Sequence, residues 1–206
     1  MSILNELASA LSVRSYDPNK ALAQKIVDTN DAAGIKELID NLGDKKLQSD
    51  IIKTLYEVGE RKPALIAPHA TVFIALLENK NNRMVWGAMT ALSAVATESA
   101  PILYNAIAKI VAIADKGTVI TKDHAVNILV KLSAIKQYAP DTMPLLLEQI
   151  LAAPINQMPT YSEKAMPIID VTHKAAFLEV LATRLPDIEG DTKRKRLEKV
   201  IKKIKG

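Results

Sequence analysis

The sequence repeats its apolar pattern at a step of 37 residues, and this periodicity limits the fold more strongly than any other feature. Aliphatic residues fall in register over three or four copies, in two independent columns: Ile39, Leu76, Ile113 and Ile150, and Leu55, Leu92 and Leu129. Such self-similarity is typical of proteins in which one small unit is stacked many times, because a single unit cannot bury its own apolar face. The chain is therefore expected to fold as an array of repeats.

Each copy predicts a pair of helices, since its apolar residues recur at helical spacing in two segments. The first helix of a copy begins near a proline, at Pro63, Pro101 and Pro140, and proline is well tolerated in the first turn of a helix. The second helices are predicted over residues 45–60, 82–96, 121–134 and, after an insertion, 173–185. Helix caps are predicted at Asp44, Asn82 and Thr121.

Two helices with apolar stripes bury those stripes only when neighbouring copies stack on them, which gives one continuous core. The composition agrees, because aromatic residues make up only 4% of the chain. The expected fold is all-α: a right-handed α-α superhelix of about four two-helix repeats with capping helices. Residues 1–206 form one domain in this prediction, with N-terminal capping helices in 1–30 (over 2–12 and 18–29), repeats over 31–185 and a basic C-terminal capping helix over 191–206.

Two stretches, "LGDKKLQSDIIKTLYEVGE" and "ENKNNRMVWGAMTALSAVA", follow the order of polar turn, aliphatic residue and small residue that is characteristic of HEAT repeats. Over roughly residues 31–185 the chain therefore resembles the HEAT-repeat family and its armadillo relatives. It departs from the family where Gln48, Val85 and Lys122 stand in place of an arginine. The resemblance implies a solenoid whose second helices line a concave, partner-binding face.

Several kinds of chemistry are excluded or lack candidates. The chain has no cysteine, and its seven glycines form neither a Walker-type nor a dinucleotide-binding loop. His69, His124 and His173 are too far apart in sequence to suggest a metal site and are interpreted as structural. No catalytic residue, cofactor or metal is therefore predicted, and we expect a protein that is not an enzyme. The N-terminal stretch is a poor signal peptide and the apolar stretches are too short to span a bilayer, so a cytoplasmic location without membrane contact is expected.

Positive charge is concentrated at the C-terminus. Eight of the 27 Lys and Arg residues follow Thr192, where Glu198 is the single carboxylate, which leaves 19 basic and 22 acidic residues elsewhere. The tail pattern predicts an amphipathic helix with Leu197, Val200, Ile201 and Ile204 on one stripe. It suits a capping helix and, alternatively, a nucleic-acid-binding surface. HEAT-like DNA alkylation-repair glycosylases share the architecture, but the acidic body of this chain makes that function less favoured.

A helical wheel divides the second helices into two faces. Starting from Leu47, Met84 and Thr121, positions 4, 7 and 8 residues further on share one face and are predicted to be core. Positions near the opposite face form a mixed polar and aromatic ridge. From this ridge and its surroundings we predict six partner-binding residues: Trp86, Tyr56, Lys53, Arg83, Asp123 and Asn127. Trp86, the only tryptophan, either contacts a partner or packs on a neighbouring repeat, and both interpretations remain open at this stage.

The function expected from these patterns is a non-catalytic scaffold that binds a protein or peptide partner along the concave face. Nucleic-acid binding through the basic C-terminal helix is the alternative. An enzyme comes third and would use the proline-rich insertion over 153–169, near Tyr161, because long irregular segments often carry function.

Overall fold

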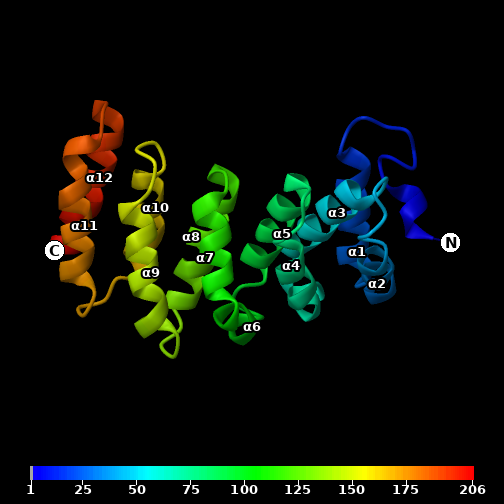
Figure 1. The fold of residues 1–206 in the computed structure, drawn as a ribbon, viewed down its shortest axis with the longest axis horizontal. Coiled ribbons are helices and arrows are strands. Elements are labelled where there is room, and N and C mark those ends of the chain that lie inside the picture. Colours follow the sequence, from blue (N-terminus) through cyan, green and yellow to red (C-terminus); the bar gives the residue numbers. More distant parts are fainter. Residues whose placement is uncertain (1) are drawn as a thin grey trace. The chain divides into compact units, whose positions relative to one another are not determined.

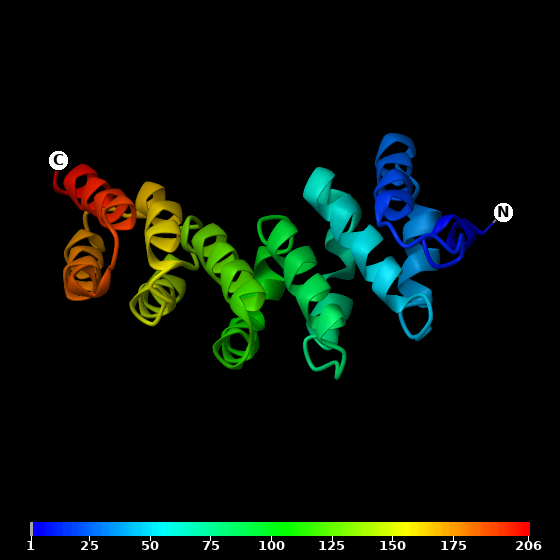
Figure 2. The ribbon, with the colours of Figure 1, turned by 90° about the horizontal axis from the view of Figure 1, so that it is seen from above.

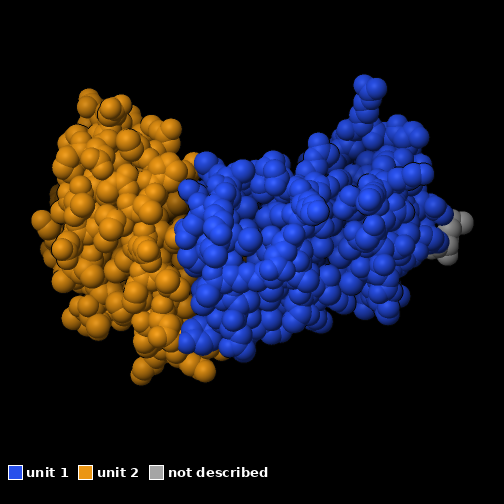
Figure 3. Space-filling model, viewed as in Figure 1, with its two compact units in different colours: residues 1–125 blue, residues 126–206 orange. Residues whose placement is uncertain are grey.

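The computed structural model describes residues 2–206, and every regular element within that range is an α-helix or a 3-10 helix (Figure 1). The all-α prediction is confirmed. The chain divides into two compact units, residues 1–125 (unit 1) and 126–206 (unit 2), which Figure 3 colours separately. The boundary between them falls inside α8 (Val119–Ser133).

Unit 1 consists of helices stacked in sequence order. Its elements before α8 are η1 (Ile3–Glu6), α1 (Asp17–Thr29), α2 (Ala32–Asp40), α3 (Gln48–Arg61), η2 (Pro63–Leu65), η3 (Ala67–His69), α4 (Ala70–Leu76), α5 (Asn82–Ala94), α6 (Ala100–Asn105) and α7 (Ile107–Lys116). Helices α1, α3 and α5 pack side by side in that order, as Figure 2 shows from above. Helix α2 packs on α3, and α4 packs on α5, so the predicted helix pairs are present in this unit.

The core of unit 1 follows the predicted wheel. The core positions of α3 and α5, together with the first such position of α8, are all fully buried: Ile51, Thr54, Leu55, Ala88, Ala91, Leu92 and Ala125. Gly87 permits a close approach of α3 and α5, because a Cβ atom at this position would lie 2.4 Å from Cγ1 of Ile52. Small residues on α5 therefore serve helix packing, as their spacing predicted.

Unit 2 holds two further helix pairs after the C-terminal part of α8. Its elements are α9 (Ala139–Leu151), α10 (Met158–Ala165), η4 (Met166–Ile168), α11 (Lys174–Arg184), η5 (Leu185–Asp187) and α12 (Asp191–Lys205). Helix α9 packs beside α11 and α10 packs beside α12, while each pair is also in contact internally. Tyr161 of α10 and Phe177 of α11 are the two largest fully buried side chains of this unit.

This arrangement corrects the prediction for residues 153–185. The proline-rich segment is not an irregular insertion: it contains α10, whose first turn holds Pro159 and whose residues Met158, Tyr161 and Ala165 are buried. The segment over 173–185 is not a second helix either, since α11 packs in the row of the first helix α9. Pro159 and Pro167 lie in the first turns of α10 and η4, where the missing N–H group has no partner to lose, so they do not break the repeat.

The N-terminal segment and the caps also differ from prediction. Residues 18–29 lie within α1 as expected, but 2–12 form only the short η1 followed by turns. Helix α5 is capped by Asn81, whose side chain accepts a hydrogen bond of 3.0 Å from the Arg83 amide, and not by Asn82. Thr121 lies inside α8, and Asp44 lies in the turn before α3. Pro101 and Pro140 lie in the first turns of α6 and α9, as predicted.

Candidate functional site

A groove of about 400 Å³ lies on unit 1, across α3 and α5. Its lining comes from the loop before α1, from α3, from α5 and from the start of α8: Tyr16, Ser49, Ile52, Lys53, Tyr56, Arg83, Trp86, Gly87, Thr90 and Ile120. We call it the α3/α5 groove. It brings together four of the six predicted partner-binding residues, namely Lys53, Tyr56, Arg83 and Trp86.

The two walls of the groove come from consecutive second helices. Helix α3 contributes Ser49, Ile52, Lys53 and Tyr56, and α5 contributes Arg83, Trp86, Gly87 and Thr90. Both sets have the spacing i, i+3, i+4 and i+7, which places four side chains on one helix face. At the step of 37 residues Ser49 corresponds to Trp86 and Lys53 to Thr90, so the two faces overlap in the repeat without coinciding. The close approach of Gly87 to Ile52 makes the floor of the groove narrow.

The α3 wall carries a small charge network. Lys53 Nζ donates to Glu57 Oε1, and Arg61 Nη1 donates to Glu57 Oε2 at 2.6 Å. Burial acts to lower the pKa of Lys53, but its hydrogen bonds to Glu57 and Tyr56 outweigh this effect and raise the pKa. Burial likewise acts to raise the pKa of Glu57, but the bonds from Lys53 and Arg61 hold it below the ordinary value. Lys53 and Glu57 are therefore both charged at neutral pH.

Two aromatic rings flank the Lys53 ammonium group. Its Nζ atom lies 4.5 Å from the centroid of the Tyr56 ring and 5.9 Å from that of Tyr16. Both distances lie within the range of cation–π attraction. Lys53 is thus held in place by Glu57 on one side and by tyrosine faces on the other, and its position fixes the α3 side of the groove.

The α5 wall presents Arg83 and Trp86. Arg83 is exposed, and no ion pair of its guanidinium group is seen within residues 2–206. Trp86 is partly exposed and lines the groove. It is therefore not a core residue, although part of its surface is covered by the protein. Thr90 Oγ1 donates to the Trp86 carbonyl oxygen at 2.9 Å and lies 3.0 Å from His124 Nε2. These contacts tie the groove wall to α8 within unit 1.

Asp123 and Asn127 do not line this groove. Both are partly exposed on α8, but Asp123 is outside the lining and Asn127 belongs to unit 2. Conversely, Tyr16 could not be predicted from a periodic pattern, because this residue directly precedes α1 in a loop. Ile52 and Gly87 were missed because a wheel of one helix cannot show which residues meet across two helices.

The histidines take part in separate local contacts. His124 contacts Thr90, and His173 Nδ1 lies 2.7 Å from Asp170 Oδ1. Burial lowers the pKa of His69. Across residues 2–206, no group of three or more potential metal-binding side chains is found. Within the same range, no helix combines the length and the apolar character needed to cross a membrane.

Comparison with known proteins finds similarity to solved structures but not to any family model or curated protein sequence. Two crystal structures of engineered proteins, both from the Northeast Structural Genomics Consortium, are similar at 16% sequence identity each. The first has a TM-score of 0.65 over 100% of this chain and 97% of its own, and the second has a TM-score of 0.64 over 98% of this chain and 58% of its own. At this identity the likeness concerns the fold.

Proposed function

We propose that this chain is a HEAT-like helical-repeat scaffold, wound as a right-handed α-α superhelix, that binds a segment of a partner protein in the α3/α5 groove without catalysing a reaction. The stacking of helix pairs within each unit supports the architectural part of this proposal. The composition of the groove supports the functional part.

The observation that carries the functional proposal is the convergence of Trp86, Tyr56 and Arg83 on one hollow from two neighbouring repeats. Tryptophan, tyrosine and arginine are the residues most often responsible for binding energy at protein interfaces. Each can present apolar area together with hydrogen-bond donors, and Trp86 and Tyr56 are only partly buried in the absence of a partner. The groove is therefore suited to anchoring one or two side chains of a peptide.

The charges of the lining favour an acidic segment. Lys53 and Arg83 are the ionised groups of the lining, and no carboxylate belongs to it. Glu57 neutralises part of the charge of Lys53, which leaves Arg83 as the cation best placed for a partner. A segment with a carboxylate next to a large apolar residue matches this pattern, because the carboxylate can accept two parallel hydrogen bonds from the guanidinium group.

Trp86 provides a direct test, since it is the only tryptophan and its emission reports on the groove alone. A random peptide library is screened on the immobilised full chain, and selected peptides are titrated against it. We expect them to change Trp86 emission, and we expect Trp86→Ala and Arg83→Ala to weaken labelled-peptide binding about tenfold or more. Ile102→Ala, on an exposed residue of α6, is the matched control. Selected peptides that leave the emission unchanged and bind all variants equally would refute the proposal.

Nucleic-acid binding through α12 is the second candidate. Lys195, Lys199, Lys202 and Lys203 are exposed on this helix. Such a row of cations neutralises phosphates, and its affinity falls steeply with salt. A duplex DNA titration at several salt concentrations, repeated with Lys195→Glu/Lys199→Glu, tests it: loss of binding in this variant supports the candidate. A DNA alkylation-repair activity is less favoured, because α3 and α5 present no carboxylate in the groove lining and the body of the chain is net acidic.

A further inference from the structure

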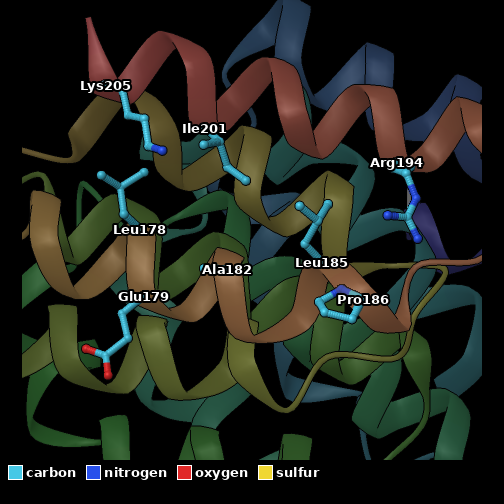
Figure 4. Close-up of a pocket in the computed structure, with 8 residues that line it drawn as sticks. All are labelled: Leu178, Glu179, Ala182, Leu185, Pro186, Arg194, Ile201 and Lys205. Atoms are coloured by element: carbon cyan, nitrogen blue, oxygen red, sulfur yellow. The ribbon is translucent and has the colours of Figure 1, made fainter.

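A second and larger hollow lies in unit 2, between α11 and α12, with a volume of about 690 Å³ (Figure 4). Leu178 of α11, Leu185 at the start of η5 and Ile201 of α12 point into the space between the two helices, and Ala182 of α11 lies between the leucines. An adjoining hollow of about 430 Å³ shares Leu185, Ile201 and Lys205 with it. Because of these shared lining residues we describe the two hollows together as the α11/α12 groove.

The apolar floor of this groove is the exposed margin of the core stripe. Phe177 and Leu181 of α11, and Leu197 and Val200 of α12, are the buried residues of these helices. Leu178, Leu185 and Ile201 border these residues on the helical wheel but remain only partly buried. Unit 2 therefore leaves part of its apolar stripe uncovered, and this surface is available to a partner.

The lining residues extend along α12 over the length of a short helix. Along α12 its residues are Arg194, Glu198, Ile201 and Lys205, with the spacing i, i+4, i+7 and i+11 on one helix face. Eleven residues of helix rise by about 16 Å, or three turns. Leu178 and Ala182 of α11 and Leu185 directly after it have the spacing i, i+4 and i+7. A groove between two helices with such a floor accepts the apolar face of a third helix.

The rim of the groove is basic. Arg194 and Lys205 stand at its two ends, and Lys202 lines the adjoining hollow. The carboxylates are Glu198 and Glu179, and Glu179 points away from the space between the helices in Figure 4. Helix α12 as a whole carries eight Lys and Arg residues against Asp191 and Glu198. The charge of the rim is therefore complementary to a partner with carboxylates flanking its apolar face.

We propose that the α11/α12 groove binds an acidic amphipathic helix of a partner protein, about three turns long. Its apolar face covers Leu178, Leu185 and Ile201, and its carboxylates pair with Arg194, Lys202 and Lys205. A nucleic acid would use the cations but leave the apolar floor exposed, and the groove offers no aromatic ring on which a base could stack. This site lies in the other unit from the α3/α5 groove and does not depend on it.

The test uses the full chain and a fluorescent peptide of about 14 residues, with leucines at i, i+3, i+4 and i+7 and glutamates elsewhere. We expect saturable binding by anisotropy, about tenfold weaker for a scrambled peptide of the same composition. Ile201→Ser and Lys202→Glu/Lys205→Glu should each weaken binding about tenfold, whereas Val171→Ser, at a residue 88% exposed, should have no effect. Lys202 and Lys205 are exposed, so the charge variant tests the site even if Ile201→Ser alters folding, which circular dichroism detects.

Other occupants give different results. Equal binding of the designed and scrambled peptides would overturn the proposal, as would an affinity that neither variant changes. Sedimentation that shows self-association abolished by Ile201→Ser would assign the groove to a second copy of the chain. A 20-base-pair duplex or a phosphatidylserine vesicle that competes with the peptide and is itself displaced by Ile201→Ser would assign it to an anionic polymer or lipid surface instead.

Discussion

The ammonium nitrogen of Lys53 lies 4.5 Å from the centroid of the Tyr56 ring, three residues further along α3. Lys53 also donates to Glu57, and the ring of Tyr16 lies on another side of it. One cation thus connects the loop before α1 with the groove-lining face of α3. The relationship indicates that Lys53 shapes the α3/α5 groove as well as lining it.

The contact between Lys53 and Tyr56 should be measurable as a coupling energy. In a double-mutant cycle with Lys53→Met and Tyr56→Leu, we expect about 0.5 to 1 kcal/mol of interaction in the free energy of unfolding, because the ring face attracts the cation. Tyr56→Phe keeps the ring face and should retain most of the coupling. Equal coupling for leucine and phenylalanine, measured by urea unfolding, would exclude the cation–π contribution.

The Glu57 carboxylate should make stability depend on acid pH. Its pKa in the folded protein lies below the ordinary value of 4.5, so the folded state binds the proton more weakly than the unfolded state. The resulting stabilisation is complete above pH 4.5 and is lost as the pH falls through the folded pKa. Glu57→Gln has no such group, and its unfolding free energy should fall less between neutral pH and about pH 3.

At neutral pH, Glu57→Gln should lower the free energy of unfolding by about 1 to 3 kcal/mol, since it weakens the charge-assisted hydrogen bonds from Lys53 and Arg61. Urea unfolding at a series of pH values checks both effects. Glu60→Gln, on the next and exposed glutamate of α3, is the control. Parallel pH curves for the wild type and Glu57→Gln would show that the carboxylate has no special role.

Gly87→Ala should destabilise unit 1 in spite of the higher helix propensity of alanine. The added methyl would lie 2.4 Å from Cγ1 of Ile52, a branched side chain with little freedom to move. Overpacking costs about 1 to 3 kcal/mol and the higher helix propensity of alanine offsets about 1 kcal/mol of it, so we expect a net loss of up to about 2 kcal/mol in the free energy of unfolding. Gly43→Ala meets no atom within 4 Å and should be tolerated. Ile52→Ala removes the atoms that the new methyl group would meet, so the double variant Gly87→Ala/Ile52→Ala should be more stable than the sum of the two single effects predicts. Additive effects would argue against the steric cause.

Tyr161→Ala should destabilise unit 2 strongly. The side chain is 1% exposed within α10, and truncating a buried aromatic residue costs about 3 to 5 kcal/mol. Val171→Ala, in the exposed loop that follows, should change the unfolding free energy by less than about 0.5 kcal/mol. Thermal and urea unfolding measure both values. A small effect at Tyr161 would indicate that the segment is a surface loop after all.

The core face of the second helices and the helix pairs could be predicted from the sequence wherever three copies share the apolar pattern. Ile51, Ala88 and Ala125 lie on the predicted core face and are fully buried, because side chains four residues apart must share a helix face. The order of helices after residue 150 could not be predicted from the sequence. A proline can break a helix or stand in its first turn. Pro159 stands in the first turn of α10, which packs on α12.

The same division applies to the groove. The wheel placed Lys53, Tyr56 and Trp86 away from the core, and the structure brings all three to one groove together with Arg83. The wheel also suggested Asp123 and Asn127, which lie outside the groove, because residues on one ridge need not border the same hollow. Tyr16 enters the groove from a loop, where no periodic pattern restricts the backbone.

The sequence by itself determined the all-α class, the pairing of helices in unit 1 and the core faces of α3 and α5. These properties follow from the period of the apolar residues, which each helix expresses locally. The tertiary structure alone decided that α10 is a core helix, that Gly87 meets Ile52, and that α11 and α12 enclose an apolar groove with a basic rim. Such features depend on which faces of different helices meet, and no single helix encodes that contact in its own pattern.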